Sequence, residues 1–232
     1  MATFTATANS NTTIGYAQYG STTWNRGTTN GACQGAYQGT SASRSRVGVM
    51  VFSGAGAALK GKIITQITLR ITCSAAGSGS SSKKLSFRRS NYQTLQTGIR
   101  GSAQVGAALG TLTGKFYNNT VTHTLSATSN ATLFEAMKTY FAEGNSVLVL
   151  YNGETSSSSG YSSNYARVTS CTITVTYIHA TVWYRDGSTW KQCTVWYRNG
   201  STWQQCTVWY RSGGSWVQVV PYYCNGGTWV RV

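Results

Sequence analysis

Apolar and polar positions alternate in several short segments of the first 178 residues. Between residues 63 and 73, for example, Ile67, Leu69, Ile71 and Cys73 occupy every second position. A period of two places apolar side chains on one face of an extended strand and polar ones on the other. Segments of this kind, rich in Val, Ile, Thr and Tyr, predict strands at 3–8, 46–52, 63–73, 84–88, 121–125, 146–151 and 167–177.

Two stretches rich in Gly and Ser, 75–82 and 155–163, lie between predicted strands and are typical of exposed loops. About seven short strands joined in this way favour a β-sandwich or jelly roll. The chain has 232 residues, which is long enough to bury a core without disulfides. The sequence therefore predicts an all-β protein whose residues 1–178 form a jelly-roll β-sandwich domain.

One segment, 131–143, has helical periodicity instead. Thr132 and Glu135 have the spacing of a capping box at its start, and Gly144 follows as a stop signal. We expect this short helix to cover an open end or edge of the sandwich. Its apolar residues recur at i, i+1, i+4, i+7 and i+8 and share one face: Leu133, Phe134, Met137, Tyr140 and Phe141.

The order of these parts resembles a known family. A basic-led strand, SRSRVGVMVF, is followed by ITQITLRITC and KLSFRR, a short helix, LFEAMKTYFAEG, leads into NSVLVLY, and the domain closes on SCTITVTY. Over most of residues 1–178 this order resembles the DNRLRE-type jelly rolls, relatives of carbohydrate-binding modules found in secreted and virion proteins. The resemblance implies a galactose-binding-like sandwich and glycan binding, and it carries no catalytic residues.

The C-terminal part repeats with a period of 13. In register it reads VWYRDGSTWKQCT, VWYRNGSTWQQCT, VWYRSGGSWVQVV and PYYCNGGTWVRV. An Asp-Gly or Asn-Gly dipeptide in three of the copies is a two-residue hairpin turn signal. We therefore predict a second domain, 179–232, formed by a meander of four 13-residue β-hairpin repeats. With the turn at Asp186-Gly187, Trp183 would face Trp190 across the first hairpin.

Seven of the 8 Trp residues lie in these repeats, and arginines recur beside them. Trp rings with Arg guanidinium groups bind sugars and anionic polymers, and an Arg over a Trp face is also a purely structural brace. Single-stranded nucleic acid is disfavoured, because its binders show a denser basic stripe. The candidate glycan- or partner-binding residues are Trp183, Arg185, Trp190, Trp196, Arg198, Trp203, Trp209, Arg211, Trp216 and Trp229.

The repeats are similar to the short Gly-Thr-Trp-Lys-x-Val hairpins at the ends of phage tail and fibre proteins. They also resemble choline-binding repeats of cell-wall proteins, but they are shorter and lack the alternating linker of those repeats. A single-layer meander exposes one apolar face to water, so this face must pack on the meander itself, on the jelly roll or on copies of the meander. The last option predicts a homo-oligomer, with a trimer favoured and the repeats near its axis.

Charge and chemistry narrow the function classes. The chain has 19 Lys and Arg against 4 Asp and Glu, a net charge of +15, so its partners are expected to be anionic. Carboxylate pairs, calcium cages and catalytic triads need more acids and histidines than are present. We therefore expect no enzyme, no cofactor and no metal site from the few residues of these types: Glu135, Glu143, Glu154, Asp186, His123 and His179.

The six cysteines have no CxxC spacing and no nearby histidine, which argues against zinc. Cys73 and Cys171 fall on the apolar side of predicted strands and are expected to be buried thiols. Cys193 and Cys206 are replaced by valine in later repeats, which marks their positions as apolar. The oxidation state of these two and of Cys224 is left open.

No run approaches 18 apolar residues, so we expect no membrane span. The start, MATFTATANS, does not resemble a signal peptide. We expect a non-enzymatic phage virion protein of a tail, fibre, neck or capsid surface, assembled in the host cytoplasm, released by lysis and binding anionic host-surface polysaccharide. One alternative is a purely structural decoration or attachment protein whose repeats dock to other virion proteins. Another is a cell-wall-binding module of a bacterial surface protein.

Overall fold

The computed structural model describes residues 1–39, 45–74, 82–155 and 157–178, together with the backbone of eight strands within 182–231. Contacts between Cα atoms divide the chain into two compact units. One holds residues 1–60 and 64–177, and the other holds 61–63 and 178–232.

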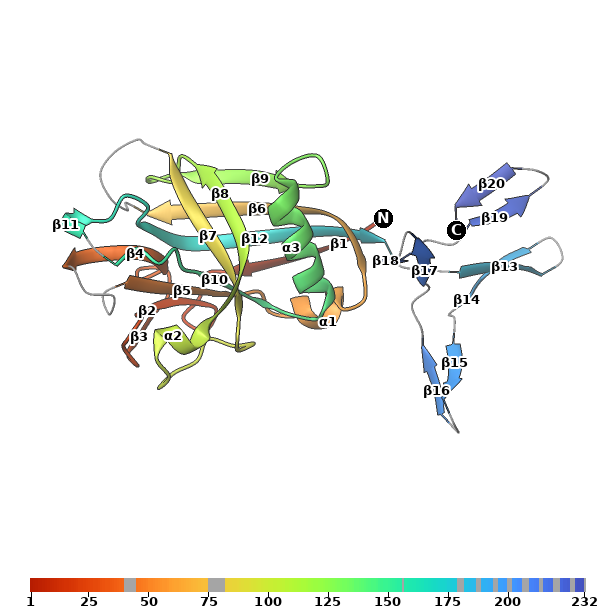
Figure 1. Ribbon diagram of the computed structural model, residues 1–232, viewed down its shortest axis with the longest axis horizontal. Coiled ribbons are helices and arrows are strands. Elements are labelled where there is room, and N and C mark those ends of the chain that lie inside the picture. Colours follow the sequence, from red (N-terminus) through yellow and green to blue (C-terminus); the bar gives the residue numbers. More distant parts are fainter. Residues whose placement is uncertain are drawn as a thin grey trace. The chain divides into compact units, whose positions relative to one another are not determined.

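The described residues of the first unit are mostly β-structure with three short helices, which confirms an all-β class for this part (Figure 1). The helices are α1 (Ala55–Leu59), α2 (Gly101–Gln104) and α3 (Ala131–Ala142). The strands are β1 (Ala2–Ala8), β2 (Ile14–Gln18), β3 (Trp24–Arg26), β4 (Ala32–Gly39), β5 (Ser45–Val51), β6 (Ile63–Ser74), β7 (Lys83–Ser90), β8 (Val105–Gly114), β9 (Thr120–Leu125), β10 (Val147–Leu150), β11 (Ser157–Tyr161) and β12 (Ala166–Ile178).

These twelve strands form one nearly closed, sandwich-like sheet. Its main path runs β8-β7-β10-β5-β4-β12-β6-β9, while β1 pairs with β12, β11 with β4, and β2 with both β3 and β5. One layer therefore contains β1, β12, β6 and β9, and the other contains β5, β10, β7 and β8. In Figure 1 the ribbons of β7 and β8 cross those of β6 and β12.

Strand β4 connects the two layers. Its first residues pair with β12, with Cys33 opposite Arg167, and its middle pairs with β5, with Gly35 opposite Arg46. Gly48 of β5 lies where β4 passes, and a Cβ atom on Gly48 would be 2.6 Å from the backbone nitrogen of Cys33. Gly35 itself has a φ of +85°, which side chains rarely adopt. Glycine at these two positions allows the chain to cross between layers.

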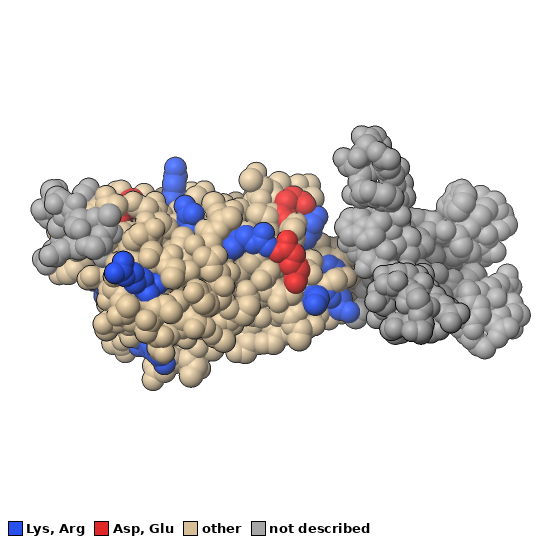
Figure 2. All heavy atoms as spheres, turned by 60° about the horizontal axis from the view of Figure 1, so that its bottom comes forward, with Lys and Arg blue, Asp and Glu red and all other residues tan. Residues whose placement is uncertain are grey.

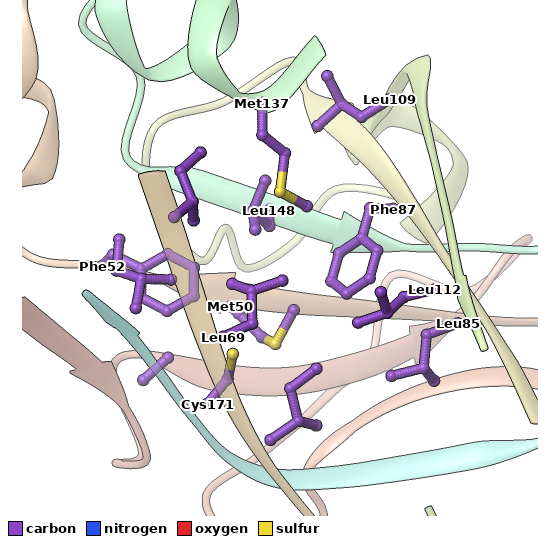
Figure 3. Packing of buried hydrophobic residues seen from close by; sticks show 14 of the residues in the cluster. Met50, Phe52, Leu69, Leu85, Phe87, Leu109, Leu112, Met137, Leu148 and Cys171 are labelled. Atoms are coloured by element: carbon purple, nitrogen blue, oxygen red, sulfur yellow. The ribbon is translucent and has the colours of Figure 1, made fainter. Parts of the chain in front are cut away.

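The main core lies between the layers and draws apolar residues from both (Figure 3). Leu69 of β6 and Cys171 of β12 come from one layer, and Phe87 of β7 and Leu148 of β10 come from the other. Each is at most 1 % exposed. This packing explains the alternation in the sequence, since every second residue of these strands enters the core.

A second apolar cluster covers the other face of β5 and β10. Val47, Val49 and Val51 of β5 pack with Val147 and Val149 of β10. Strand β10 is consequently buried on both faces, which a period of two does not predict. The segment 91–104 forms part of the layer over this second cluster. The indole Nε1–H of Trp24 donates a hydrogen bond to the carbonyl of Ile99 in that segment, at 3.0 Å.

Helix α3 packs its predicted apolar face into the main core, and Met137 points into it in Figure 3. The helix contacts β8 and β9, which are the edge strands of the two layers, so it covers an open side as expected. Gly144 follows with a φ of +96° and ends the helix. The capping-box prediction is wrong: Asn130, with a φ of 51°, is the N-cap, and no side chain caps the helix.

The seven predicted strands are all present, with ends that coincide or differ by one or two residues. The prediction of a plain loop at 155–163 is wrong, because β11 lies within it and pairs with β4. The run of serines in this segment shows no apolar alternation from which a strand could be predicted. The thiols of Cys33, Cys73 and Cys171 are free and buried, which confirms the prediction for the latter two.

Candidate functional site in the first unit

The ten candidate residues of the repeats lie in four two-stranded antiparallel hairpins. Their side chains are outside the described residues, so their binding role stays a prediction, as do the meander and the state of Cys193, Cys206 and Cys224. The hairpins are β13 (Val182–Asp186) with β14 (Thr189–Cys193), β15 (Trp196–Asn199) with β16 (Thr202–Gln205), β17 (Trp209–Ser212) with β18 (Ser215–Gln218), and β19 (Tyr222–Asn225) with β20 (Thr228–Arg231).

The backbone register of the first hairpin corrects one expectation. Asp186 pairs with Thr189, so Trp190 lies opposite Arg185, and Trp183 lies opposite Gln192. The Trp183–Trp190 pair predicted from an Asp-Gly turn is therefore wrong. The same register recurs in the next two hairpins. Trp196 and Trp209, the equivalents of Trp183, lie opposite glutamines. The arginines lie opposite tryptophans, Arg198 with Trp203 and Arg211 with Trp216. In the fourth, Trp229 lies opposite Cys224.

The charged side chains of the first unit are dispersed. Figure 2 shows basic residues scattered over the visible face, with acidic ones beside some of them. Lys83, Lys84, Arg88 and Arg89 are close together in the sequence, but all four lie on β7 and they are not equally exposed. The Lys83 ammonium is buried and donates to the carbonyl of Ser163 at 2.6 Å, while Arg89 forms an ion pair with a helix carboxylate. Lys83 and Arg89 are therefore each paired with another group of the first unit.

Tyrosine and arginine side chains gather instead where β4 crosses between the layers. We call Tyr16, Tyr37, Arg46, Tyr161, Tyr165 and Arg167 the tyrosine–arginine cluster. The guanidinium carbon of Arg46 is 4.4 Å from the ring centroid of Tyr16 and 6.0 Å from that of Tyr37. The Tyr37 ring lies 4.6 Å from Tyr161, whose ring lies 4.3 Å from Tyr165. These contacts link Arg46 and the four tyrosine rings into one continuous chain.

Strand pairing positions this cluster. Arg167 of β12 is opposite Cys33, Arg46 of β5 is opposite Gly35, and Tyr161 of β11 is opposite Tyr37. Positions 33, 35 and 37 of β4 share one face because side chains alternate along a strand. The crossing strand thus gathers residues from three neighbouring strands.

The two arginines lack carboxylate partners. In the described part of the chain neither Arg46 nor Arg167 forms an ion pair, and the Nε atom of each is buried without a hydrogen-bond partner. Burial disfavours the charge on Arg167, but the neighbouring Tyr165, Cys33 and Tyr161 outweigh it and raise the pKa of Arg167. Arginine side chains in proteins carry a positive charge, so this cluster holds two cations for which the described residues provide no carboxylate partner.

The nearby carboxylate of Glu154 is held by other groups. It accepts hydrogen bonds from the Ser162 hydroxyl at 2.5 Å and from the Asn164 side-chain amide at 2.9 Å. Burial raises the pKa of Glu154, but these hydrogen bonds and those of Asn152 outweigh burial and lower it overall. Glu154 therefore holds the residues that directly follow Tyr161, 162–164, and it forms no ion pair with Arg46 or Arg167, both of which the structure describes.

The cluster is partly open to solvent. Tyr161 is 39 % exposed, Tyr16, Tyr37 and Arg46 are half-buried, and Tyr165 is buried beneath them. The Tyr165 hydroxyl donates to the Cys33 sulfur at 3.6 Å, and burial raises the pKa of both groups. An exposed ring and two cations suit a ligand with a flat apolar face and an anionic group.

Sequence reasoning missed this cluster because its residues are spread over 150 positions. The one available signal was composition, since ten of the 15 Tyr residues precede the repeats. In the described residues, no three His, Cys, Asp or Glu side chains lie close enough to hold a metal ion. The helices described there include none long and apolar enough to cross a membrane.

Comparison with protein-family models finds no match to this chain. Comparison with curated proteins finds none either.

Proposed function

We propose that this chain is a non-enzymatic phage virion appendage protein that binds anionic host-surface polysaccharide. In this proposal the first unit is a jelly roll of the carbohydrate-binding type, and the aromatic repeats form a second binding or docking domain. The assembly is a homo-oligomer that reaches the virion in the host cytoplasm and leaves by lysis. Its position is a tail, fibre, neck or capsid surface.

The observation that carries the binding proposal is the tyrosine–arginine cluster. Tyr161 offers a ring to the face of a sugar, and Arg46, held against Tyr16, offers a cation to an acidic group on the same ligand. Neither arginine has a carboxylate partner among the described residues. An anion from outside therefore gains charge-assisted hydrogen bonds without displacing an internal ion pair.

The repeats support the same proposal at the level of sequence and backbone register. In three of the four hairpins an arginine lies opposite a tryptophan. The combination of ring and guanidinium thus occurs in both parts of the chain. In the competing proposal, a structural attachment protein, these columns would instead be buried against other virion proteins.

Binding of the full chain to an array of acidic and neutral bacterial polysaccharides tests the proposal. Tyr161→Ala should lower binding to acidic polymers at least tenfold, because the exposed ring is lost. Tyr117→Ala is the matched control, since Tyr117 is also 39 % exposed but lies outside the cluster. Equal affinity of both variants and the parent, or no binding by the parent, would contradict the proposal.

A double substitution in the repeats separates the adhesin from the attachment protein. Trp190→Ala with Trp203→Ala should leave an adhesin assembled but weaken its binding to polysaccharide. The same change should make a docking element dissociate from the particle. Electron microscopy of the native assembly gives the position and copy number in either case.

A further inference from the structure

Strand β1 is the edge of its layer. In the described part of the chain its only partner is β12, to which it pairs in continuous register from Ala2 opposite Tyr177 to Ala8 opposite Cys171. An edge strand presents alternate backbone N–H and C=O groups away from its partner. No backbone hydrogen bond from β1 to any other described segment is present.

This edge lacks the usual protection. Natural edge strands are guarded by lysines, prolines, bulges, short length or a covering helix or loop. Helix α1 contacts β1 on its core side, where Gly54 lies against the Phe4 ring. The seven residues of β1, ATFTATA, include no charge and no proline, and their register has no shift. By contrast, the edge strand β8 pairs with β7 through two register irregularities, and the outer strand β3 has three residues and includes Arg26.

The outward face of β1 is a row of threonines that continues onto β12. Thr3, Thr5 and Thr7 are exposed and lie opposite Thr176, Thr174 and Thr172. Two of these pairs join their hydroxyl groups, Thr5 with Thr174 at 3.2 Å and Thr7 with Thr172 at 2.8 Å. The opposite face of β1 supplies Phe4, Ala6 and Ala8 to the core.

Such a strand is complementary to itself. Two β1 strands can pair antiparallel about a two-fold axis that passes midway between their Thr5 residues. Thr5 then faces Thr5 of the other copy, and Thr3 faces Thr7. Residues that face each other lie on the same side of a sheet, so the threonine face and the core face both continue from copy to copy. The layers of the two copies then join into one sheet.

Charge favours β1 over β9, the other edge of the layer. Each chain carries a net charge of +15, so two copies associate best where neither presents a cation. Across β1 and β12 the facing outward pairs are all threonines, whereas on the β9 side Arg70 of β6 is exposed opposite Thr122. A contact through β9 would bring two Arg70 side chains closer together.

We propose that β1 is an interface at which two copies of this chain pair edge to edge and antiparallel. This contact is separate from the repeats, on which the expected trimer rests. It is isologous, so it makes the number of copies in the assembly even.

The mass of the full chain by analytical ultracentrifugation, over a range of concentrations, tests the proposal. The parent should contain an even number of copies, and Thr5→Lys should halve that number, because two lysines would face each other across the axis. Thr124→Lys is the control, since Thr124 is also exposed, lies on the edge strand β9 and faces a threonine, Thr68. It should leave the mass unchanged.

Hydrogen exchange gives a second measurement that does not depend on a variant. The amides of β1 should all be protected in the associated parent, and about half of them should exchange faster once dilution has halved the number of copies. An odd copy number, a monomeric parent, or equal dissociation by Thr5→Lys and Thr124→Lys overturns the proposal. Melting of each variant near the parent's temperature shows that the comparison is made on folded chains.

Discussion

The guanidinium group of Arg46 packs against the ring of Tyr16, with 4.4 Å from its central carbon to the ring centroid. The contact joins β5 to β2 at a point where no described carboxylate pairs with the arginine. A cation held by a ring keeps its charge and gives up little hydrogen-bonding capacity. The contact therefore orients Arg46 while leaving it able to bind an anion.

Replacing Arg46 with Gln should weaken binding of acidic polysaccharide and make the remaining binding less sensitive to salt, because one cationic contact is lost. The unfolding free energy should fall by about 1–2 kcal/mol, because the contact is half-buried and lies between the exposed and the desolvated cases. Affinity measured at two salt concentrations, with a denaturant titration, checks both parts.

Arg70→Gln is the control for that change, since Arg70 is an exposed arginine of β6 outside the tyrosine–arginine cluster. It lowers the net charge by the same amount. If both variants lose affinity equally, overall charge rather than the cluster determines binding.

Tyr140→Phe should destabilise the first unit by about 1–3 kcal/mol, because a buried donor and acceptor both lose their partner. The Tyr140 hydroxyl donates to the carbonyl of Val147 at 2.7 Å and accepts from the amide of Ser90 at 3.0 Å. One atom thus links α3 to β7 and to the start of β10. Thermal unfolding measures the loss, and Tyr117→Phe, at an exposed ring, should leave the midpoint unchanged.

The sequence predicts those elements that have one buried face. Strands β6 and β12 alternate cleanly, and α3 has its apolar stripe, so burial on a single side determines their pattern. Strand β4 was not predicted, because ACQGAYQG has small and polar residues where the chain crosses between layers. The two arginines that pair with β4, Arg167 opposite Cys33 and Arg46 opposite Gly35, are 121 positions apart in the sequence, and no local pattern connects them.

The candidate site shows the same limit. Period-13 repeats are visible in a single sequence, so tryptophan and arginine columns could be listed from it, but the register could not. Asp186 pairs with Thr189, a register that differs from the one that an Asp186-Gly187 turn implies, and this shift replaces the expected Trp183–Trp190 pair by Arg185–Trp190. The tyrosine–arginine cluster depends on five strands meeting in space, and only the fold reveals it.

Gly48→Ala should destabilise the first unit by about 1–3 kcal/mol through overpacking alone. Its φ is not in the left-handed region, but a Cβ atom there would lie 2.6 Å from one backbone atom of β4 and 2.7 Å from another. The crossing strand would have to move, and the tyrosine–arginine cluster would move with it. We therefore expect weaker polysaccharide binding together with a lower melting temperature.

Gly98→Ala separates this steric effect from backbone strain. Gly98 has a φ of +78° and open space around it, so the substitution costs about 1 kcal/mol of strain without a clash. It should leave binding unchanged. A Gly48 variant as stable as the parent would show that β4 crosses β5 at a greater distance.

Glu154→Gln should destabilise the first unit by about 1–2 kcal/mol at neutral pH, because the ionised carboxylate accepts hydrogen bonds from Ser162, Ser163 and Asn164. Although burial raises the pKa of Glu154, these bonds lower it overall below its usual 4.5. The folded state therefore releases the Glu154 proton at a lower pH than the unfolded state does. The resulting stabilisation is complete above the unfolded pKa and is lost as the pH falls through the folded pKa.

The difference in unfolding free energy between the parent and the Gln variant should accordingly be constant above about pH 6 and shrink toward zero in acid. Denaturant titrations at several pH values measure it. Glu135→Gln is the control, since Glu135 is exposed and pairs only with Lys138 on the same helix, so its effect should stay within about 0.5 kcal/mol. A difference that does not depend on pH would show that Glu154 acts through its shape and not through its charge. In that case the hydrogen bonds of the ionised Glu154 carboxylate would not be what positions the residues next to Tyr161.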